Sequence, residues 1–132
     1  MTAALIRAAR QAQRAAYAPY SNYAVGAALE GGDGRIFVGC NVENASYGVT
    51  ICAERMAVGA AVVAGCRSFK RLVVTTEADP PAAPCGACRQ MLSEFGPDLD
   101  VVGVGPRSER HWRLGDLLPE GFGLGSSPRP TR

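Results

Sequence analysis

The sequence predicts an α/β domain in which helices are layered on a partly parallel sheet. After a hairpin in the first third of the chain, strand-like and helix-like segments alternate, which is typical of α/β layer architectures. Hydrophobic residues make up 47% of the 132 residues and charged residues 20%, proportions that suit a globular protein. This length is enough for one domain with its own core, and no repeat or linker divides it.

The N-terminal part is predicted to hold a helix and a β-hairpin. In residues 2–17 the apolar side chains fall on about one face of a helix, at Leu5, Ile6, Ala9, Ala12 and Ala16. Pro19 ends this helix. Residues 24–29 and 35–40 are predicted strands, and the glycine-rich turn at residues 31–34 between them is a strong hairpin signal.

The second predicted helix, residues 53–64, is apolar nearly all round in its later turns. A helix of this kind must be buried on more than one side. In so small a domain we expect the sheet to cover one side and a neighbouring subunit to cover another.

The next predicted elements are a strand and a third helix. Residues 71–76 form a strand whose continuous apolar run at 72–74 suits a central position in the sheet. Residues 85–95 form a helix that follows Pro84 and ends at Gly96-Pro97.

The C-terminal part is predicted to be shorter and more polar. Residues 100–104 form another strand, residues 107–113 a charged and solvated hairpin, and residues 114–118 a short helical turn. The end of the chain, 123–132, is rich in Gly, Ser and Pro and is expected to be loose.

Composition and charge argue against several classes of function. The formal net charge of +2 is too small to indicate binding to nucleic acid or to an anionic membrane. Arginines interrupt the N-terminal segment, so it does not resemble a secretory leader, and the longest apolar run is too short to span a membrane. Five cysteines, two of them in a Cys-x-x-Cys motif, favour a reduced cytoplasmic protein over a disulfide framework.

Two cysteine motifs indicate a catalytic metal site. They are Cys52-Ala53-Glu54-Arg55 and, about thirty residues later, Pro84-Cys85-Gly86-Ala87-Cys88-Arg89-Gln90. Together they offer three thiolates for one zinc ion, which leaves the fourth position of a tetrahedral site open for water. Zinc deaminases combine a Pro-Cys-x-x-Cys motif with a non-ligating Glu near the first ligand, and this chain has the version with three cysteines.

Two residues beside Cys52 are predicted to assist this chemistry. Glu54 is the expected proton carrier, which accepts a proton from water at the metal and delivers it to a substrate nitrogen. Zinc with three thiolates carries a net charge of −1, and we hypothesise that Arg55 donates to a thiolate and reduces this charge.

The cysteines have two other interpretations. A redox Cys-x-x-Cys pair leaves the Cys52-Ala53-Glu54 motif unexplained. A structural zinc knot needs a fourth ligand, for which Cys40, Cys66 and His111 are the candidates. Cys66 and Cys40 are better interpreted as packed residues and His111 as a surface residue, so no fourth ligand is expected. Together with the motif spacing, this favours a catalytic zinc site over a structural one.

Four motifs in the chain occur in the same order in a known family. They are residues 17–28 (YAPYSNYAVGAA), residues 39–47 (GCNVENASY), residues 52–55 (CAER) and residues 84–90 (PCGACRQ). From about residue 15 to residue 124 the chain resembles the small, homotetrameric cytidine deaminases.

The resemblance implies a three-layer α/β/α domain with a mixed five-stranded sheet, comprising residues 1–125 and followed by a flexible tail, 126–132. It implies hydrolysis of cytidine and deoxycytidine to uridine and deoxyuridine in pyrimidine salvage. One zinc ion per subunit would lie on Cys52, Cys85 and Cys88, and a zinc-bound hydroxide would attack C4 of the base while Glu54 moves protons.

The resemblance also assigns contacts to the substrate. Asn41 and Glu43 would bind the ribose hydroxyls, and backbone groups of Ala53 would contact the pyrimidine edge or the attacking water. Tyr23 stands where the family usually has Phe against the pyrimidine, and Phe122 would cover the base from a neighbouring subunit. From the residues alone, Asn41 and Glu43 are equally suited to capping a loop, Tyr23 to a half-buried strand edge, and Phe122 to docking on its own core.

Three other functions remain as alternatives. The chain could instead be a related enzyme that acts on another cytosine compound, such as a nucleoside antibiotic, although the Asn41/Glu43 pair favours a substrate with a free ribose. Editing of RNA or DNA would need a basic track with stacking aromatic residues, which this chain lacks. A non-catalytic zinc-binding interaction module is the third alternative.

Overall fold

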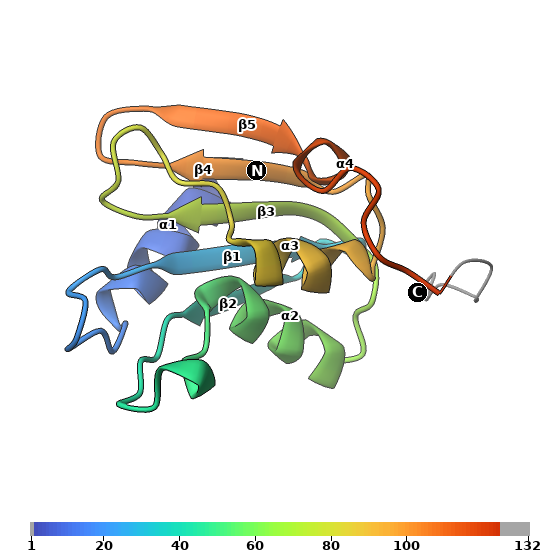
Figure 1. Cartoon of the computed structure of the whole chain (residues 1–132). Helices are drawn as coiled ribbons and strands as arrows, with labels where there is room; N and C mark the ends of the chain where they lie inside the picture. The colour runs from blue at the N-terminus through green and yellow to red at the C-terminus, as the bar shows by residue number, and fades with distance from the viewer. Residues whose placement is uncertain (1, 125–132) are drawn as a thin grey trace.

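A mixed five-stranded sheet forms the centre of the structure, a computed structural model that describes residues 2–124. The strands lie in the order β2-β1-β3-β4-β5 (Figure 1). Their bounds are β1 Gly26–Gly31, β2 Ile36–Cys40, β3 Phe69–Thr75, β4 Asp100–Val104 and β5 Glu109–Arg113. β1 is antiparallel to β2 and β3, β3 and β4 are parallel, and β5 adds an antiparallel edge. The predicted tail, 126–132, lies outside the described residues.

Helices cover both faces of this sheet (Figure 1). One face carries α1 (Thr2–Arg14), and the other carries α2 (Ala53–Val63) and α3 (Gly86–Ser93), with the short α4 (Leu114–Leu117) beside α3. Two separate groups of buried apolar side chains, one beneath each helical layer, form the core. The predicted three-layer fold with a mixed five-stranded sheet is therefore confirmed. No helix in residues 2–124 has the length and apolar character needed to cross a membrane.

The predicted elements are present, but some of their ends differ. The first helix stops at Arg14 and not at residue 17, because the backbone N–H of Tyr17 donates to the carbonyl of Asn41 (3.0 Å) in a bridge between distant segments. The charged hairpin is confirmed as the β4–β5 pair. A 3₁₀ turn, Tyr47–Val49, was not predicted.

Two glycines allow the helices to lie close to the sheet. A Cβ atom at Gly26 would stand 2.0 Å from the carbonyl oxygen of Ala9 in α1. One at Gly39 would stand 2.3 Å from the carbonyl oxygen of Ala53, the first residue of α2. Gly39 therefore sets how near the start of α2 comes to the sheet.

Helix α2 is buried on the side that faces the sheet, as predicted. Ala57, Val58 and Ala61 are fully buried there. On the other side Val63 is 90% exposed, so the apolar character of this side is not explained by contacts within residues 2–124.

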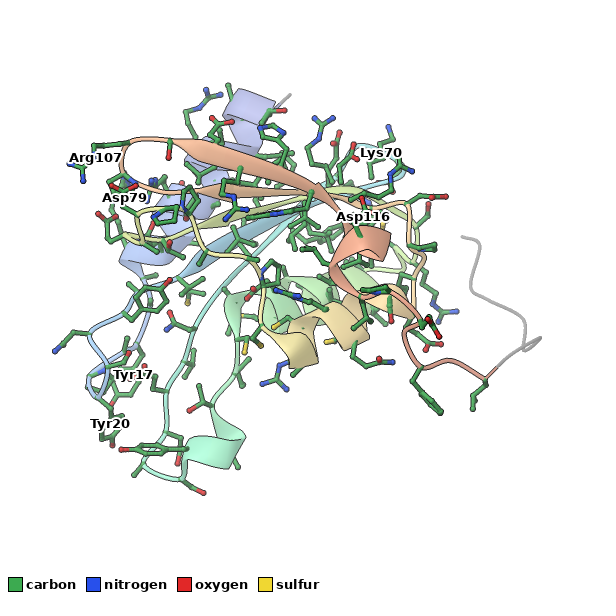
Figure 2. All side chains as sticks on the ribbon, turned by 45° about the horizontal axis from the view of Figure 1, so that its top comes forward. Tyr17, Tyr20, Lys70, Asp79, Arg107 and Asp116 are labelled. Atoms are coloured by element: carbon green, nitrogen blue, oxygen red, sulfur yellow. The ribbon has the colours of Figure 1, made fainter. Side chains whose placement is uncertain are left out.

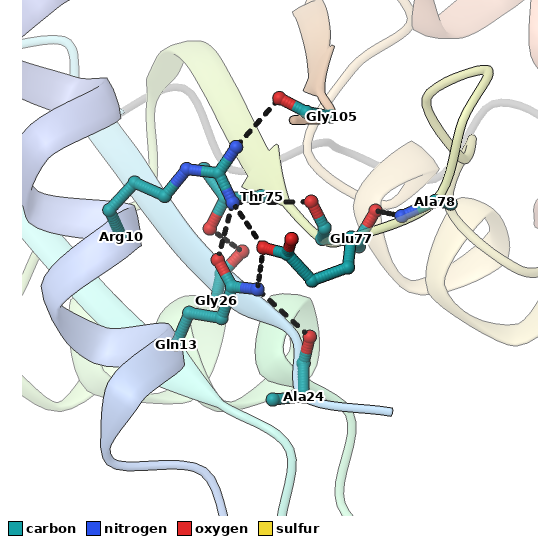
Figure 3. A network of polar contacts seen from close by, with 9 residues as sticks. Arg10, Gln13, Ala24, Gly26, Thr75, Glu77, Ala78 and Gly105 are labelled. Atoms are coloured by element: carbon teal, nitrogen blue, oxygen red, sulfur yellow. Dashed lines mark hydrogen bonds and ion pairs between the residues drawn. The ribbon is translucent and has the colours of Figure 1, made fainter. Parts of the chain in front are cut away.

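Arg10 connects helix α1 to the C-terminal ends of the two parallel strands β3 and β4 (Figure 3). Its guanidinium donates to the carbonyl oxygens of Thr76 (3.1 Å) and Gly105 (2.7 Å), which follow β3 and β4. Glu77 pairs with the same guanidinium at 3.2 Å, and Gln13 bonds to both of these side chains. One charged group thus holds a helix and two strand ends together.

We expect Arg10→Ala to lower the free energy of unfolding by about 1–3 kcal/mol, because two partly buried carbonyls lose a charged donor. Urea denaturation measures this change. Arg7→Ala is the matched control, since Arg7 is an exposed arginine on the same helix. Equal denaturation midpoints for the two variants would contradict the prediction.

Candidate active site

The three predicted ligands converge at the starts of two helices. Cys52 is the N-cap of α2, Cys85 is the N-cap of α3, and Cys88 lies in the first turn of α3. Their sulfur atoms all lie within 4.8 Å of one another, and those of Cys85 and Cys88 are 3.6 Å apart. A tetrahedral zinc ion with Zn–S bonds of about 2.3 Å would hold its sulfurs about 3.8 Å apart, so the cluster fits zinc.

The electrostatic surroundings of the three cysteines also favour the binding of a cation. Burial raises the pKa of Cys88, and the charges of Glu54, Cys52 and Cys85 raise it further. Burial opposes ionisation of Cys85 as well, but hydrogen bonds from the backbone and thiol of Cys88 and from the backbone of Ala87 outweigh burial and hold the pKa of Cys85 below its ordinary value. A divalent cation among these sulfurs would stabilise the thiolates that their mutual repulsion disfavours.

Among the described residues, no fourth ligand joins the three cysteines. Within residues 2–124 the three cysteines form the only cluster of three or more potential metal ligands. Cys66 is buried, with its thiol 3.5 Å from the carbonyl of Ser68, and His111 is exposed beside Glu109. Cys40 is half-buried at the end of β2. The arrangement is that of a site with an open position and not of a closed structural knot.

A cavity of about 240 Å³ adjoins the cluster. The predicted residues Tyr23, Asn41, Ala53 and Glu54 all line it, together with Cys52 and Cys85. The rest of its wall is mostly aliphatic, from Val25, Thr50, Val74, Thr76, Ala82 and Ala83. An apolar slot with a few converging polar groups suits a flat heterocyclic ligand.

Glu54 places a buried carboxyl in this cavity. It lies in the first turn of α2 and is only 6% exposed. Burial raises the pKa of this carboxyl, and nearby donors offset the effect only in part. A carboxyl with a raised pKa can hold a proton as well as release one, as a general acid and base must.

Arg55 lies beside the cluster, as hypothesised. Its guanidinium donates to the carbonyl oxygen of Thr50 (2.8 Å) and lies 3.8 Å from the sulfur of Cys52. The hydrogen bond from Arg55 to this sulfur raises the pKa of the guanidinium. The Arg55 Nε atom is buried without a hydrogen-bond partner within the described residues.

Asn41 is at the cavity, but its amide also holds the backbone nearby. Its Oδ1 accepts from the N–H of Val25 (2.9 Å), and its Nδ2 donates to the carbonyl of Tyr23 (2.8 Å). These two bonds fix the segment that leads into β1. One N–H and one lone pair of the amide remain for a ligand.

Glu43 lines a second cavity of about 360 Å³ and not the first. Its carboxylate accepts from the backbone N–H groups of Tyr20 (3.0 Å) and Ser21 (3.2 Å) and from the Ser21 hydroxyl. The Ser21 hydroxyl, and after it the two N–H groups, hold the pKa of Glu43 below its ordinary value. Thr50 lines both cavities, which makes them neighbours.

Phe122 does not reach the zinc cluster of its own chain. Its side chain is 73% exposed, and it is absent from the lining of both cavities. Its carbonyl accepts from Nε2 of Gln90 on α3 at 3.0 Å.

Two residues that support the site were missed from the sequence. Thr50 joins the cavities and accepts from Arg55. Arg89 donates to the carbonyls of Pro84 (2.7 Å) and Leu117 (2.9 Å), which fixes the loop that leads to Cys85. Each stands within two residues of a predicted ligand, and that adjacency was the only available signal.

Comparisons with known proteins agree with this geometry. The family model described as "Cytidine and deoxycytidylate deaminase zinc-binding region" matches residues 2–104. A cytidine deaminase from Mycobacterium tuberculosis is 46% identical over 126 residues, which cover 94% of this chain and 91% of that protein. A probable cytidine deaminase from Dictyostelium discoideum is 53% identical over 116 residues, covering 86% and 78% of the two chains.

Solved structures give the same result. The crystal structure of cytidine deaminase from Burkholderia pseudomallei superposes with a TM-score of 0.89 at 52% identity, covering 92% of this chain and 99% of that one. With so long a match in both sequence and fold, this chain belongs to the cytidine deaminase family, a family of zinc-binding hydrolytic enzymes.

Proposed function

We propose that this protein hydrolyses cytidine and deoxycytidine to uridine and deoxyuridine, as part of pyrimidine salvage. The observation that carries the proposal is the buried Glu54 carboxyl, which shares a cavity with two of the three clustered cysteines. Residues 1–125 are the single catalytic domain and bind one zinc ion per subunit. The protein acts in the reducing cytoplasm, where its five cysteines stay reduced; none of them forms a disulfide within residues 2–124.

The zinc ligands and Glu54 have different roles in the hydrolysis. Zinc held by Cys52, Cys85 and Cys88 would supply Lewis acidity that lowers the pKa of a water molecule. Glu54 accepts one proton from water and delivers it to N3 of the pyrimidine. It then takes the remaining proton from the hydroxyl added at C4 and gives it to the departing amine. Water oxygen is added at C4 and ammonia leaves, so the amine is exchanged for a carbonyl.

The base and the sugar of the substrate occupy different cavities. The pyrimidine lies in the cavity with Glu54, against Tyr23, where the backbone of Ala53 contacts its edge. The sugar extends past Thr50 towards Glu43, and Asn41 binds a sugar hydroxyl with the N–H and lone pair that its backbone contacts leave free.

We expect Glu54→Gln to lower kcat by about 10²- to 10⁴-fold, because the amide cannot carry the proton. The loss of cytidine absorbance on conversion to uridine measures turnover, and metal analysis should show about one zinc per chain in both proteins. Removal of zinc from the wild type by a chelator should abolish turnover.

Glu109→Gln, on the exposed edge strand, is the matched control and should retain full activity. Full activity of Glu54→Gln would contradict the assigned role. Wild-type protein that holds zinc but leaves cytidine unchanged would point to another cytosine compound as substrate.

We expect Arg55→Ala to keep zinc but to hydrolyse cytidine about tenfold more slowly, because the thiolate charge at Cys52 loses its donor. Arg55→Lys retains the positive charge and should be less impaired. Kinetics at matched zinc content test this. Equal rates for the wild type and Arg55→Ala would contradict the proposed role.

The active protein is a homotetramer in which Phe122 of each subunit covers the base in a neighbour's site. Two features support this. Apolar side chains are exposed at the end of α2 and in the segment before this helix, at Val63 and at Tyr47, Val49 and Ile51. Phe122 is exposed and away from its own zinc cluster, so a symmetric assembly could place it in another.

We expect Val63→Glu to lower the mass of the particle in solution and to reduce activity in parallel, because a charge would be buried in the interface. Light scattering during size-exclusion chromatography measures the mass. Lys70→Glu, a charge change at an exposed position on β3, is the control. A monomer with undiminished activity would contradict the shared-site assembly.

A further inference from the structure

A single hydroxyl links the two cavities. The hydroxyl oxygen of Ser21 accepts from the backbone N–H of Tyr23 at 3.0 Å, and the same hydroxyl donates to Oε2 of Glu43. Tyr23 lines the cavity at the zinc cluster, and Glu43 lines its neighbour. Ser21 therefore stands between the wall of one cavity and the acidic group of the other.

The donors to Glu43 are distributed unequally. Oε1 accepts two backbone N–H groups, from Tyr20 and Ser21, whereas Oε2 accepts only the Ser21 hydroxyl among the contacts within residues 2–124. A carboxylate oxygen has two lone-pair directions, so Oε2 keeps one for a further donor. The Ser21 hydroxyl decides in which direction that lone pair points.

Glu43 is half-buried at the wall of the second cavity, which Tyr20, Ser21, Tyr47 and Thr50 also line. Tyr20 projects from the loop at the end of the molecule away from Lys70 and Asp116 (Figure 2). Because Thr50 lines both cavities, a sugar attached to a base in the first cavity would extend past Thr50 towards Glu43.

We propose that Ser21 is a positioning residue for the sugar: its hydroxyl aims Oε2 of Glu43 at the 3′-hydroxyl, the ring hydroxyl that cytidine and deoxycytidine share. This inference rests on the proposed function, since it concerns the same substrate.

The test is steady-state kinetics with deoxycytidine and with 2′,3′-dideoxycytidine, which lacks the 3′-hydroxyl. Ser21→Ala should raise KM for deoxycytidine about tenfold, because Glu43 loses the donor that orients it, while kcat stays within about twofold. For dideoxycytidine the same substitution should raise KM less than about twofold, since that substrate has no hydroxyl for Glu43 to bind. Ser21→Thr keeps the hydroxyl and should restore the KM for deoxycytidine.

Ser108→Ala, in the turn between β4 and β5, is the matched serine control and should match the wild type with both substrates. Thermal unfolding and zinc content verify that each variant is folded and loaded. If Ser21→Ala does not fold, Ser21→Cys takes its place, because a thiol is similar in size but a weak donor.

An equal rise in KM for the two nucleosides would overturn the inference, because the effect would then not pass through the 3′-hydroxyl. So would an unchanged KM, or a fall in kcat alone. In each of these results the wild type still converts deoxycytidine, so the proposed function stands. Wild-type protein that converts neither nucleoside would instead overturn the proposed function and this inference with it.

Discussion

The packing of the first turns of α2 and α3 against one face of the sheet is the constraint on which the site depends. Three sulfurs from two helices can hold one metal ion only if the helix starts lie within a few ångströms of each other. Gly39 permits the close approach of α2, because any side chain there would collide with the carbonyl of Ala53. Arg89 secures the other side by bonding the loop that precedes Cys85. The same packing buries Glu54 in the cavity beside the cysteines, so the ligand geometry and the proposed acid–base chemistry have one structural cause.

The segment before β1 shows how binding groups can also be structural. Asn41 holds the backbone of Tyr23 and Val25, and Glu43 holds that of Tyr20 and Ser21. These contacts do not exhaust the hydrogen-bonding capacity of either side chain. Loop capping and sugar binding are therefore compatible functions of the same atoms. A group whose orientation is already set loses less conformational entropy when a ligand binds.

Helix α2 has two apolar sides with different consequences. The inner side forms the core beneath the sheet, with Ala57, Val58 and Ala61 fully buried. The outer side, with Val63, remains exposed in the single chain, and the proposed assembly would cover it with a second subunit. Because α2 also carries Cys52 and Glu54, an interface on its outer side would lie close to the chemistry. Assembly and catalysis would then depend on one helix.

The sequence by itself determined the fold class, the strands and helices near their true positions, and the pairing of Cys85 with Cys88, because these depend on local spacing. Cys85 and Cys88 lie on one helical turn wherever that helix packs, and Glu54 follows Cys52 at a helix start in any such fold. Tertiary structure alone decided that Cys52 meets the other two cysteines and that α1 ends at Arg14. It also decided that Glu43 lines the second cavity and not the one that adjoins the three cysteines. It also decided that Ser21 joins Glu43 to Tyr23. Such contacts join segments far apart in the chain, and only the packing of the layers and the strand register determine which of them meet.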